Sequence, residues 1–257
     1  MTGTMVAVDG GEVWADDSGG ELPPLVLLHP GVGDSRIWEP VLPALTGDHR
    51  VIRYDARGFG RSPAATTKFT LLADLIAVLD HFGLDRVPIV GCSQGGGSAL
   101  ALAVSHPARV CALVLLCPGI PGFAWPDDPA VSAAYEAAEP LGAEAVADVM
   151  QSVWAAAGRT PQVREQLVSG ARAALANQEF EEADPSVLDR LGEISVPTSL
   201  MIGDRDYRPL IDSNLEAAAR IPGCVLIEVP GLDHLPPLRV PDLVLKQIHD
   251  TLGQLGL

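Results

Sequence analysis

Gly91-Cys92-Ser93-Gln94-Gly95 places a serine between two glycines, in the pattern Gly-x-Ser-x-Gly. An apolar run before this segment and a small-residue helical pattern after it predict a strand, a sharp turn and a helix. A serine on such a turn has a strained backbone that lifts its hydroxyl above the sheet edge, and the glycines leave room for the turn. N–H groups at the start of the helix favour negative charge beside the serine. The segment therefore predicts nucleophilic attack by Ser93.

A serine nucleophile needs a base that takes its proton, and the base needs a carboxylate that fixes its tautomer. Among six histidines, His234 lies in a loop directly after the last predicted strand, where loops carry function. His29 also ends a strand, but it opens a Pro-Gly turn, and we interpret it as a brace for that turn. The other four precede a strand or lie in helices (His49, His81, His106 and His249). His234 is the predicted base.

Two aspartates follow the strand before His234, in Gly203-Asp204-Arg205-Asp206. Either could orient His234, and Asp206 is preferred because it lies deeper in the loop. Asp233, adjacent to the histidine, is expected to hydrogen-bond within its own loop. The predicted catalytic residues are Ser93, Asp206 and His234, in a chain order known for triads of this kind.

Strand and helix patterns alternate around these residues. The first strands form a hairpin that turns at Asp9-Gly10-Gly11. Continuous apolar runs then suit parallel strands that are covered on both faces. The predicted strands are 25–28, 49–54, 87–92, 110–116, 198–202 and 224–229, and the predicted helices include 34–45, 71–82, 209–221 and 240–255. This alternation predicts an α/β fold with a doubly wound sheet, whose ligands bind at the carboxyl ends of the strands.

Residues 120–191 interrupt this pattern with helical segments rich in alanine, glutamate and proline. We interpret them as a helical lid inserted into one domain, whose core is residues 1–119 and 192–257. The insertion carries twelve acidic residues against four arginines. Solvated helix faces are the main interpretation of that charge, and an acidic rim that favours a cationic substrate is the alternative. Among its aromatic residues, Trp125 and Trp154 are the candidates for a pocket wall.

The composition limits the function classes. The 257 residues are 47% hydrophobic and carry a net charge of −16, which argues against nucleic acid or an anionic membrane as partner. No 18-residue apolar stretch and no basic signal start are visible, so a cytoplasmic protein is expected. The four cysteines lack metal-ligand spacing and are expected to be buried free thiols. Neither a zinc signature nor a phosphate-binding glycine loop is present, so we expect no metal and no cofactor.

The whole chain resembles the lidded α/β-hydrolases of the enol-lactonase, cofactor-free haloperoxidase and small esterase group. Five segments carry the resemblance: His29-Pro30-Gly31, Asp55-x-Arg57-Gly58-x-Gly60-x-Ser62, Gly91-x-Ser93-x-Gly95, Gly203-x-x-Asp206 and Gly231-x-x-His234. The resemblance implies a mostly parallel eight-stranded sheet with helices on both faces. It also supports Asp206 as the triad acid, and it implies an oxyanion hole made by the N–H groups of Gln94 and, by register with Trp38, of Gly31.

Three residues depart from that family. Pro30 replaces a glycine and has no N–H to donate. Gln94 stands where methionine is common, and its side-chain amide is able to contact substrate, while Asp233 replaces a frequent glycine. Val32 and Arg36 in the same loop are further candidates for substrate contact; for Arg36, binding of a substrate carboxylate is weighed against the more expected surface role.

The function expected from these residues is a serine hydrolase that cleaves a carboxylic ester or lactone through an acyl-enzyme. Hydrolysis of a carbon–carbon bond and perhydrolysis use the same triad and remain alternatives. Epoxide hydrolase or dehalogenase chemistry is disfavoured, because those relatives carry aspartate where Ser93 stands. A ligand-binding protein or cyclase on the hydrolase scaffold is the alternative from another class. The expected partner is a small molecule, and the expected assembly is a monomer or homodimer.

Overall fold

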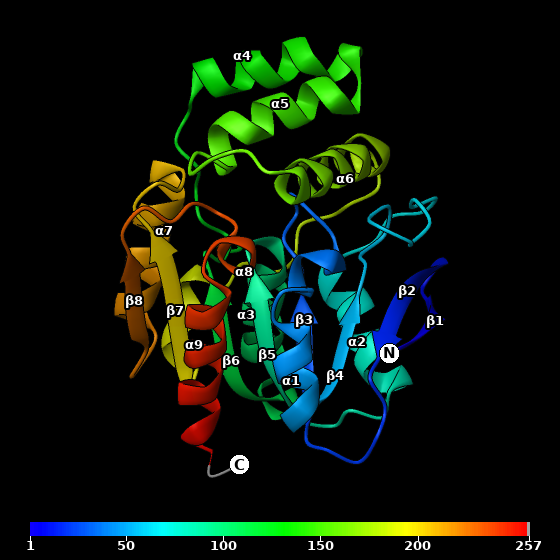
Figure 1. Ribbon diagram of the computed structural model, residues 1–257, viewed down its shortest axis with the longest axis vertical. Helices are drawn as coiled ribbons and strands as arrows, with labels where there is room; N and C mark the ends of the chain where they lie inside the picture. The colour runs from blue at the N-terminus through cyan, green and yellow to red at the C-terminus, as the bar shows by residue number, and fades with distance from the viewer. Residues whose placement is uncertain (256–257) are drawn as a thin grey trace.

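A computed structural model describes residues 1–255 of the chain, and its centre is one sheet of eight strands (Figure 1). The strands are β1 (Thr2–Val8), β2 (Gly11–Asp17), β3 (Pro24–Leu28), β4 (Arg50–Tyr54), β5 (Val87–Cys92), β6 (Val110–Leu116), β7 (Thr198–Gly203) and β8 (Val225–Val229). Their order across the sheet is β1-β2-β4-β3-β5-β6-β7-β8. Only the β1–β2 and β2–β4 pairs are antiparallel. The predicted mostly parallel eight-stranded sheet is confirmed.

The central strands form where the sequence is continuously apolar. All residues of β5 and β7 are buried, as expected for parallel strands covered on both faces. The first hairpin turns at Asp9 and Gly10, and Gly10 has a φ of 66°, a conformation that glycine adopts without strain.

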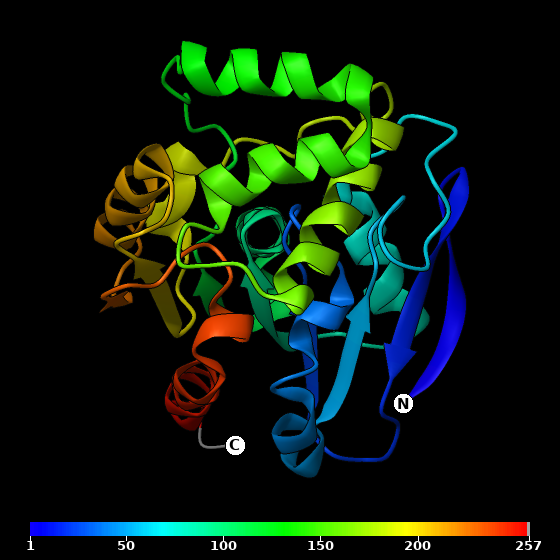
Figure 2. The ribbon, with the colours of Figure 1, turned by 45° about the horizontal axis from the view of Figure 1, so that its top comes forward.

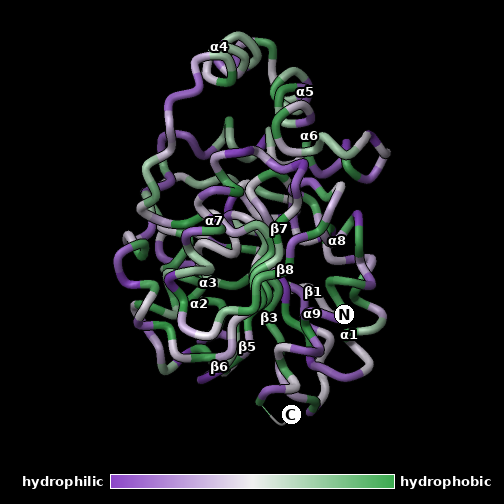
Figure 3. The backbone as a smooth tube through the Cα atoms, turned by 90° about the vertical axis from the view of Figure 1, so that its left-hand side faces the viewer, coloured by the Kyte–Doolittle hydropathy of each residue, from purple (hydrophilic) through white to green (hydrophobic). Residues whose placement is uncertain are grey.

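Helices cover both faces of the sheet, with α1 and α9 in front of it in Figure 1 and α2 and α3 behind it. The helices of this layer are α1 (Leu42–Asp48), α2 (Leu71–His81), α3 (Gln94–Ser105), α7 (Arg208–Arg220), α8 (Pro236–Arg239) and α9 (Pro241–Gly253). Two buried apolar cores result, one on each side of the sheet. Figure 3 shows that hydrophobic residues predominate in the central strands, whereas the surrounding helices mix hydrophobic and hydrophilic residues.

One predicted helix is interrupted by proline. The segment 34–45 is not one helix but a 3₁₀ turn, η1 (Ser35–Trp38), followed by α1. Pro40 lacks the N–H that would continue the first turn, and Asp34 caps that turn by accepting from the backbone of Arg36 at 3.0 Å. The helix predicted over 240–255 is confirmed as α9, which begins at Pro241, and the short α8 before it was not predicted.

Residues between β6 and β7 form a helical layer above the carboxyl ends of the strands (Figures 1 and 2). Its helices are α4 (Pro129–Ala138), α5 (Ala143–Trp154) and α6 (Pro161–Asn177). The 3₁₀ turn η3 (Glu139–Leu141) joins α4 to α5, and a second, η4 (Leu188–Glu193), follows α6 before β7. Asp128 caps α4 and Thr160 caps α6, each by accepting from a backbone N–H of the first turn. The layer therefore lies where parallel sheets bind their ligands.

All four cysteines are free thiols. Cys92 and Cys117 are buried as predicted, whereas Cys111 and Cys224 are only half-buried, because the strand ends that hold them lie near the surface. Among residues 1–255, no helix combines the length and the apolarity that crossing a bilayer requires.

Candidate active site

Ser93 occupies the turn between β5 and α3 with φ 49° and ψ −115°, a left-handed conformation that is strained for a non-glycine residue. The two flanking glycines allow the strand and helix to meet there. A Cβ on Gly91 would lie 2.6 Å from the carbonyl oxygen of Gly95, and a Cβ on Gly95 would lie 2.5 Å from that of Leu28. The turn therefore requires glycine at both positions.

Three side chains from distant segments form a hydrogen-bonded chain at the carboxyl ends of the strands. The Asp206 carboxylate accepts from Nδ1 of His234 at 2.7 Å. Because Nδ1 carries the proton, Nε2 is unprotonated and accepts from the Ser93 hydroxyl, also at 2.7 Å. His234 and Asp206 are 1% and 8% exposed. Water is therefore largely excluded from the histidine–carboxylate pair.

The neighbouring aspartates have other partners. Asp204, the alternative acid, accepts from the backbone N–H of Gly231 at 2.6 Å. Asp233 is fully buried and forms an ion pair with Arg239 at 2.7 Å, and it also accepts from the backbone of Ala157 at 2.9 Å. Asp233 thus ties the loop after α5 to the loop that carries His234.

A buried thiol lies behind this chain of side chains. The Sγ of Cys117 and the side-chain atoms of Asp206 and His234 all lie within 4.8 Å of one another, a grouping that metal sites also show. Burial and the nearby Asp206 carboxylate raise the pKa of the Cys117 thiol well above its usual range. A protonated thiol is a poor metal ligand, and Asp206 and Nδ1 already bind each other, so the grouping suits hydrogen bonding rather than metal binding.

Two backbone N–H groups lie beside Ser93 without a protein acceptor. Those of Gly31 and Gln94 donate to no group among residues 1–255. The two residues are adjacent, since a Cβ on Gly31 would lie 3.0 Å from Oε1 of Gln94. Gln94 is the first residue of α3, where N–H groups have no partner within the helix. These groups are suited to bind an oxyanion.

His29 braces the loop that carries Gly31. Its Nε2 accepts from the backbone N–H of Ala56 at 2.9 Å, which leaves Nδ1 as the donor to the carbonyl oxygen of Pro30, also at 2.9 Å. The ring is buried, so both bonds are shielded from water. This arrangement agrees with the structural role predicted for His29.

Helix α6 is fastened to the same loop through Asp34, which is fully buried. The Asp34 carboxylate accepts from Ser169 at 2.6 Å and from Gln166 at 3.2 Å, and it pairs with Arg36 at 2.7 Å. Burial opposes ionisation, but the hydrogen bonds from Arg36 and Ser169 hold the pKa of Asp34 well below its usual range. Gly170 brings the helix close, since a Cβ there would lie 2.7 Å from the Val32 backbone.

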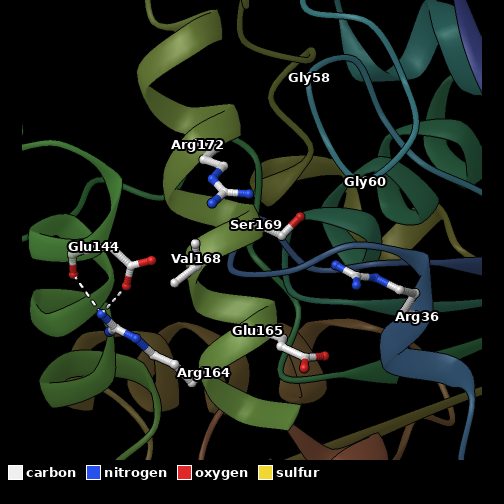
Figure 4. Close-up of a pocket in the computed structure, with 9 residues that line it drawn as sticks. All are labelled: Arg36, Gly58, Gly60, Glu144, Arg164, Glu165, Val168, Ser169 and Arg172. Carbon is white, nitrogen blue, oxygen red and sulfur yellow. Dashed lines mark hydrogen bonds and ion pairs between the residues drawn. The ribbon is translucent and has the colours of Figure 1, made fainter. Parts of the chain in front are cut away.

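This anchor determines where two of the predicted substrate contacts lie. Val32 is buried in the apolar core beneath α6. Arg36 lines a separate cavity of about 350 Å³ on the outer side of α6, opposite Arg164 and Arg172 (Figure 4). Its guanidinium already pairs with Asp34, so the structure does not bring Arg36 to Ser93.

The predicted tryptophans contribute to an aromatic wall beside His234. The ring of Trp154 lies 4.7 Å from that of His234, and the Trp154 carbonyl oxygen accepts from the His234 backbone at 3.2 Å. Trp125 is 46% exposed and stacks on Tyr207 at 6.3 Å, and Tyr207 also contacts Trp154. The insertion therefore contributes side chains directly to the surroundings of the histidine.

Two hollows meet at Gln94. One, of about 340 Å³, is lined by Ile120 and Trp125 among others and is called the Trp125 cavity below. The other, of about 400 Å³, is lined by Gly31 and Phe59 among others and is called the Phe59 cavity. Both cavities thus adjoin the residue that follows Ser93.

The sequence analysis did not identify four residues that shape the site. They are Asp34 and Ser169 beside the Gly31 loop, Tyr207 in the aromatic wall and Glu181 in the cavity linings. Asp34 had a signal, because an aspartate after a glycine turn readily caps the next helical turn. Tyr207 directly follows Asp206, but the direction of its ring depends on the insertion. Ser169 and Glu181 gave no signal, because their positions depend on how the insertion packs on the core.

A family model described as the alpha/beta hydrolase fold matches residues 23–165, more than half of the chain. The RutD protein of Variovorax paradoxus (strain S110), whose name provisionally assigns it carbamate hydrolysis, is 45% identical over 97 residues, which cover 35% of this chain and 36% of that protein. A 2-hydroxymuconate semialdehyde hydrolase of Pseudomonas sp. (strain CF600) is 39% identical over 117 residues, covering 43% of this chain and 40% of that protein. The matched stretch spans about two fifths of the length of these relatives.

Among solved structures, the chain is similar to the enol-lactonase from Burkholderia xenovorans LB400. The TM-score is 0.83 with 25% identity, and the match covers 97% of this chain and 100% of that one. Carboxylesterase CesB from Bacillus subtilis matches with a TM-score of 0.82 and 22% identity, over 98% of this chain and 91% of that one. The likeness to CesB concerns the fold alone.

Proposed function

The chain belongs to the alpha/beta hydrolase fold family, as the sequence predicted, and from this premise we propose that it is a serine hydrolase that cleaves a carboxylic ester or lactone. The observation that carries the proposal is the hydrogen-bonded chain Ser93–His234–Asp206, with 2.7 Å at each step. The unengaged N–H groups of Gly31 and Gln94 beside it support the same chemistry.

In the proposed mechanism, Nε2 of His234 takes the Ser93 proton as Oγ attacks the substrate carbonyl. Asp206 holds the imidazole in the required tautomer and stabilises the imidazolium. The N–H groups of Gly31 and Gln94 bind the tetrahedral oxyanion, each contributing about 3–4 kcal/mol to transition-state stabilisation. His234 then protonates the leaving alkoxide. Finally, it activates a water that releases the acyl group from Ser93.

Residues 120–191 act as the lid of this site in our proposal, since Trp154 and Trp125 approach it from that segment. We also propose that the protein works as a monomer or homodimer on a small molecule, without a cofactor. The four free thiols suit the reducing cytoplasm.

Cleavage of a carbon–carbon bond is the second candidate, because a 2-hydroxymuconate semialdehyde hydrolase is among the relatives. A muconate derivative carries a carboxylate. Neither the Trp125 cavity nor the Phe59 cavity is lined by lysine or arginine, so ester or lactone cleavage is favoured.

The test is hydrolysis of a p-nitrophenyl ester series and a lactone panel by the wild-type protein and by Ser93→Ala. We expect wild-type turnover and a loss of about 10⁴-fold or more in the variant, with an unchanged circular dichroism spectrum. A Ser93→Ala variant that keeps near-wild-type activity would contradict the proposal.

A further inference from the structure

The Trp125 cavity and the Phe59 cavity share Gln94, the residue that follows Ser93. Gln94 and the segment 181–183 line both the Trp125 cavity and the Phe59 cavity. Nε2 of Gln94 donates to Oε1 of Glu181 at 2.9 Å. This bond joins the residue after the nucleophile to the segment between β6 and β7, and both of its partners line the two cavities; it is called the Gln94–Glu181 bridge below.

One carboxylate oxygen of Glu181 has no hydrogen-bond donor among the described residues. Oε1 of Glu181 accepts from Gln94, whereas Oε2 accepts no hydrogen bond from residues 1–255. Glu181 is exposed and lines both cavities, so a substrate bound in either one contacts or faces its side chain. An N–H group on the substrate is the complementary donor.

The charge around the bridge has one sign. The two cavities are lined by Glu181 and Glu182, and the Trp125 cavity also by Asp184, but neither lining includes lysine or arginine. Partial burial and the neighbouring Asp184 carboxylate raise the pKa of Glu181, and the bond from Gln94 only partly offsets them. Within residues 1–255, neither cavity lining thus provides a cation that compensates the Glu181 carboxylate.

We propose that the Gln94–Glu181 bridge divides the substrate cavity into two subsites and makes the enzyme select esters or lactones that carry an ammonium or amide N–H group, against those that carry a carboxylate. This inference rests on the proposed function, because it assigns the substrate class of the same site.

The selection rests on how the Glu181 carboxylate interacts with two kinds of substrate group, an N–H donor and a carboxylate. A substrate N–H donates to Oε2 of Glu181, and an ammonium group also gains from the carboxylates around it. A substrate carboxylate meets those charges with no cation nearby, and such like-charge contacts disfavour binding strongly. Arg36 does not neutralise a substrate carboxylate in these cavities, because it pairs with Asp34 and lines a different cavity, on the outer side of α6 (Figure 4).

The test compares three esters of equal chain length: p-nitrophenyl hexanoate, p-nitrophenyl 6-aminohexanoate and mono(p-nitrophenyl) adipate. We expect kcat/KM of the wild-type protein to fall in the order ammonium, neutral, carboxylate. In Glu181→Gln, the ratio of the ammonium ester to the carboxylate ester should fall by about tenfold, because the charge is lost and the shape is kept.

Glu179→Gln is the matched control. Glu179 is exposed two residues away and lines neither cavity, so its loss changes the net charge equally and should leave the ratio within about twofold. Equal kcat/KM for all three esters, or equal ratios in the two variants, would overturn the charge selection alone. If no ester is cleaved and a fluorophosphonate does not label Ser93, the proposed function fails, and this inference fails with it.

Discussion

At the residue scale, the backbone conformation of Ser93 depends on the lack of side chains on either side of it. The positive φ of Ser93 places its hydroxyl 2.7 Å from Nε2 of His234. The fold can hold Ser93 in this strained conformation because Gly91 and Gly95 lack side chains, which lets β5 and α3 approach each other closely. The glycines therefore contribute to reactivity as well as to stability.

Gly95→Ala should lower the free energy of unfolding by about 2–3 kcal/mol, because the added Cβ meets backbone rather than a movable side chain. Urea denaturation measures this change. Gly47→Ala is the control: Gly47 lies in α1 with nothing within 4 Å of its added Cβ, and alanine there should stabilise the helix by about 0.5–1 kcal/mol. Equal effects of the two substitutions would show that the turn does not need a glycine at position 95.

The sequence indicated which residues form the hydrogen-bonded chain at Ser93, but it did not indicate all the contacts that surrounding side chains make. Ser93, His234 and Asp206 were predictable because each follows a strand pattern, and parallel strands end at one edge of a sheet. Asp206 was preferred over Asp204 for its deeper place in the loop and for the Gly203-x-x-Asp206 resemblance, and the hydrogen bond from His234 to Asp206 agrees with that choice. Arg36 shows the limit most clearly, because its partner Asp34 lies two residues away and turns it from Ser93.

At the element scale, α6 holds the loop that carries Gly31. Asp34 receives hydrogen bonds from Ser169 and Gln166, and Gly170 lets the helix contact the backbone of that loop. Helix α6 therefore fixes the loop that carries one of the proposed oxyanion donors.

Ser169→Ala should reduce kcat for an ester several-fold with little change in KM, because the loop becomes less well ordered while the cavities are kept. The lost charge-assisted hydrogen bond should also cost about 1.5–3 kcal/mol of stability. Ser169→Thr keeps the hydroxyl and should restore kcat. Ser152→Ala on α5 is the control, since Ser152 is exposed and bonds only to the backbone. A several-fold rise of KM with unchanged kcat would show that Ser169 acts on substrate binding instead.

Helices and strands could be predicted where the local sequence pattern determines the secondary structure, but not where a proline or long-range packing determines it. Apolar runs predicted β3 and β5–β8, and Thr70 correctly predicted the start of α2. The helix expected over 34–45 was wrong, because Pro40 breaks its hydrogen-bond ladder. The contact of α6 with the Gly31 loop could not be predicted, because it joins residues more than a hundred positions apart.

At the scale of the whole molecule, two groups of carboxyls respond to pH with opposite signs. Burial raises the pKa of Asp74 and Asp184 in the folded state. In Asp17 and Asp34, hydrogen bonds from paired arginines outweigh burial and lower the pKa. A raised carboxyl pKa destabilises the fold at neutral pH, and this penalty disappears as pH falls towards the unfolded value, about 3.9–4.3. A lowered pKa gives stability that is lost below that value.

The free energy of unfolding should therefore rise as pH falls from 7 towards about 5 and then decrease below about pH 4. The falling negative charge of this chain, −16 at pH 7, acts in the same direction over the first interval. Urea titrations at each pH measure the curve. Asp184→Asn should flatten the rise, whereas Glu179→Gln, at an exposed position, should not. A stability that decreases steadily from pH 7 downwards would contradict this account of the buried carboxyls.

The central claim is that His234 activates Ser93 for attack on an acyl carbon, and labelling by a fluorophosphonate with intact-mass detection tests it most directly. We predict one label per chain, located on the peptide that contains Ser93, and no label in Ser93→Ala or after prior denaturation. His234→Ala should slow labelling by several orders of magnitude, because Nε2 no longer takes the serine proton. A folded wild-type protein that stays unlabelled, or that carries its label on another residue, would contradict the claim.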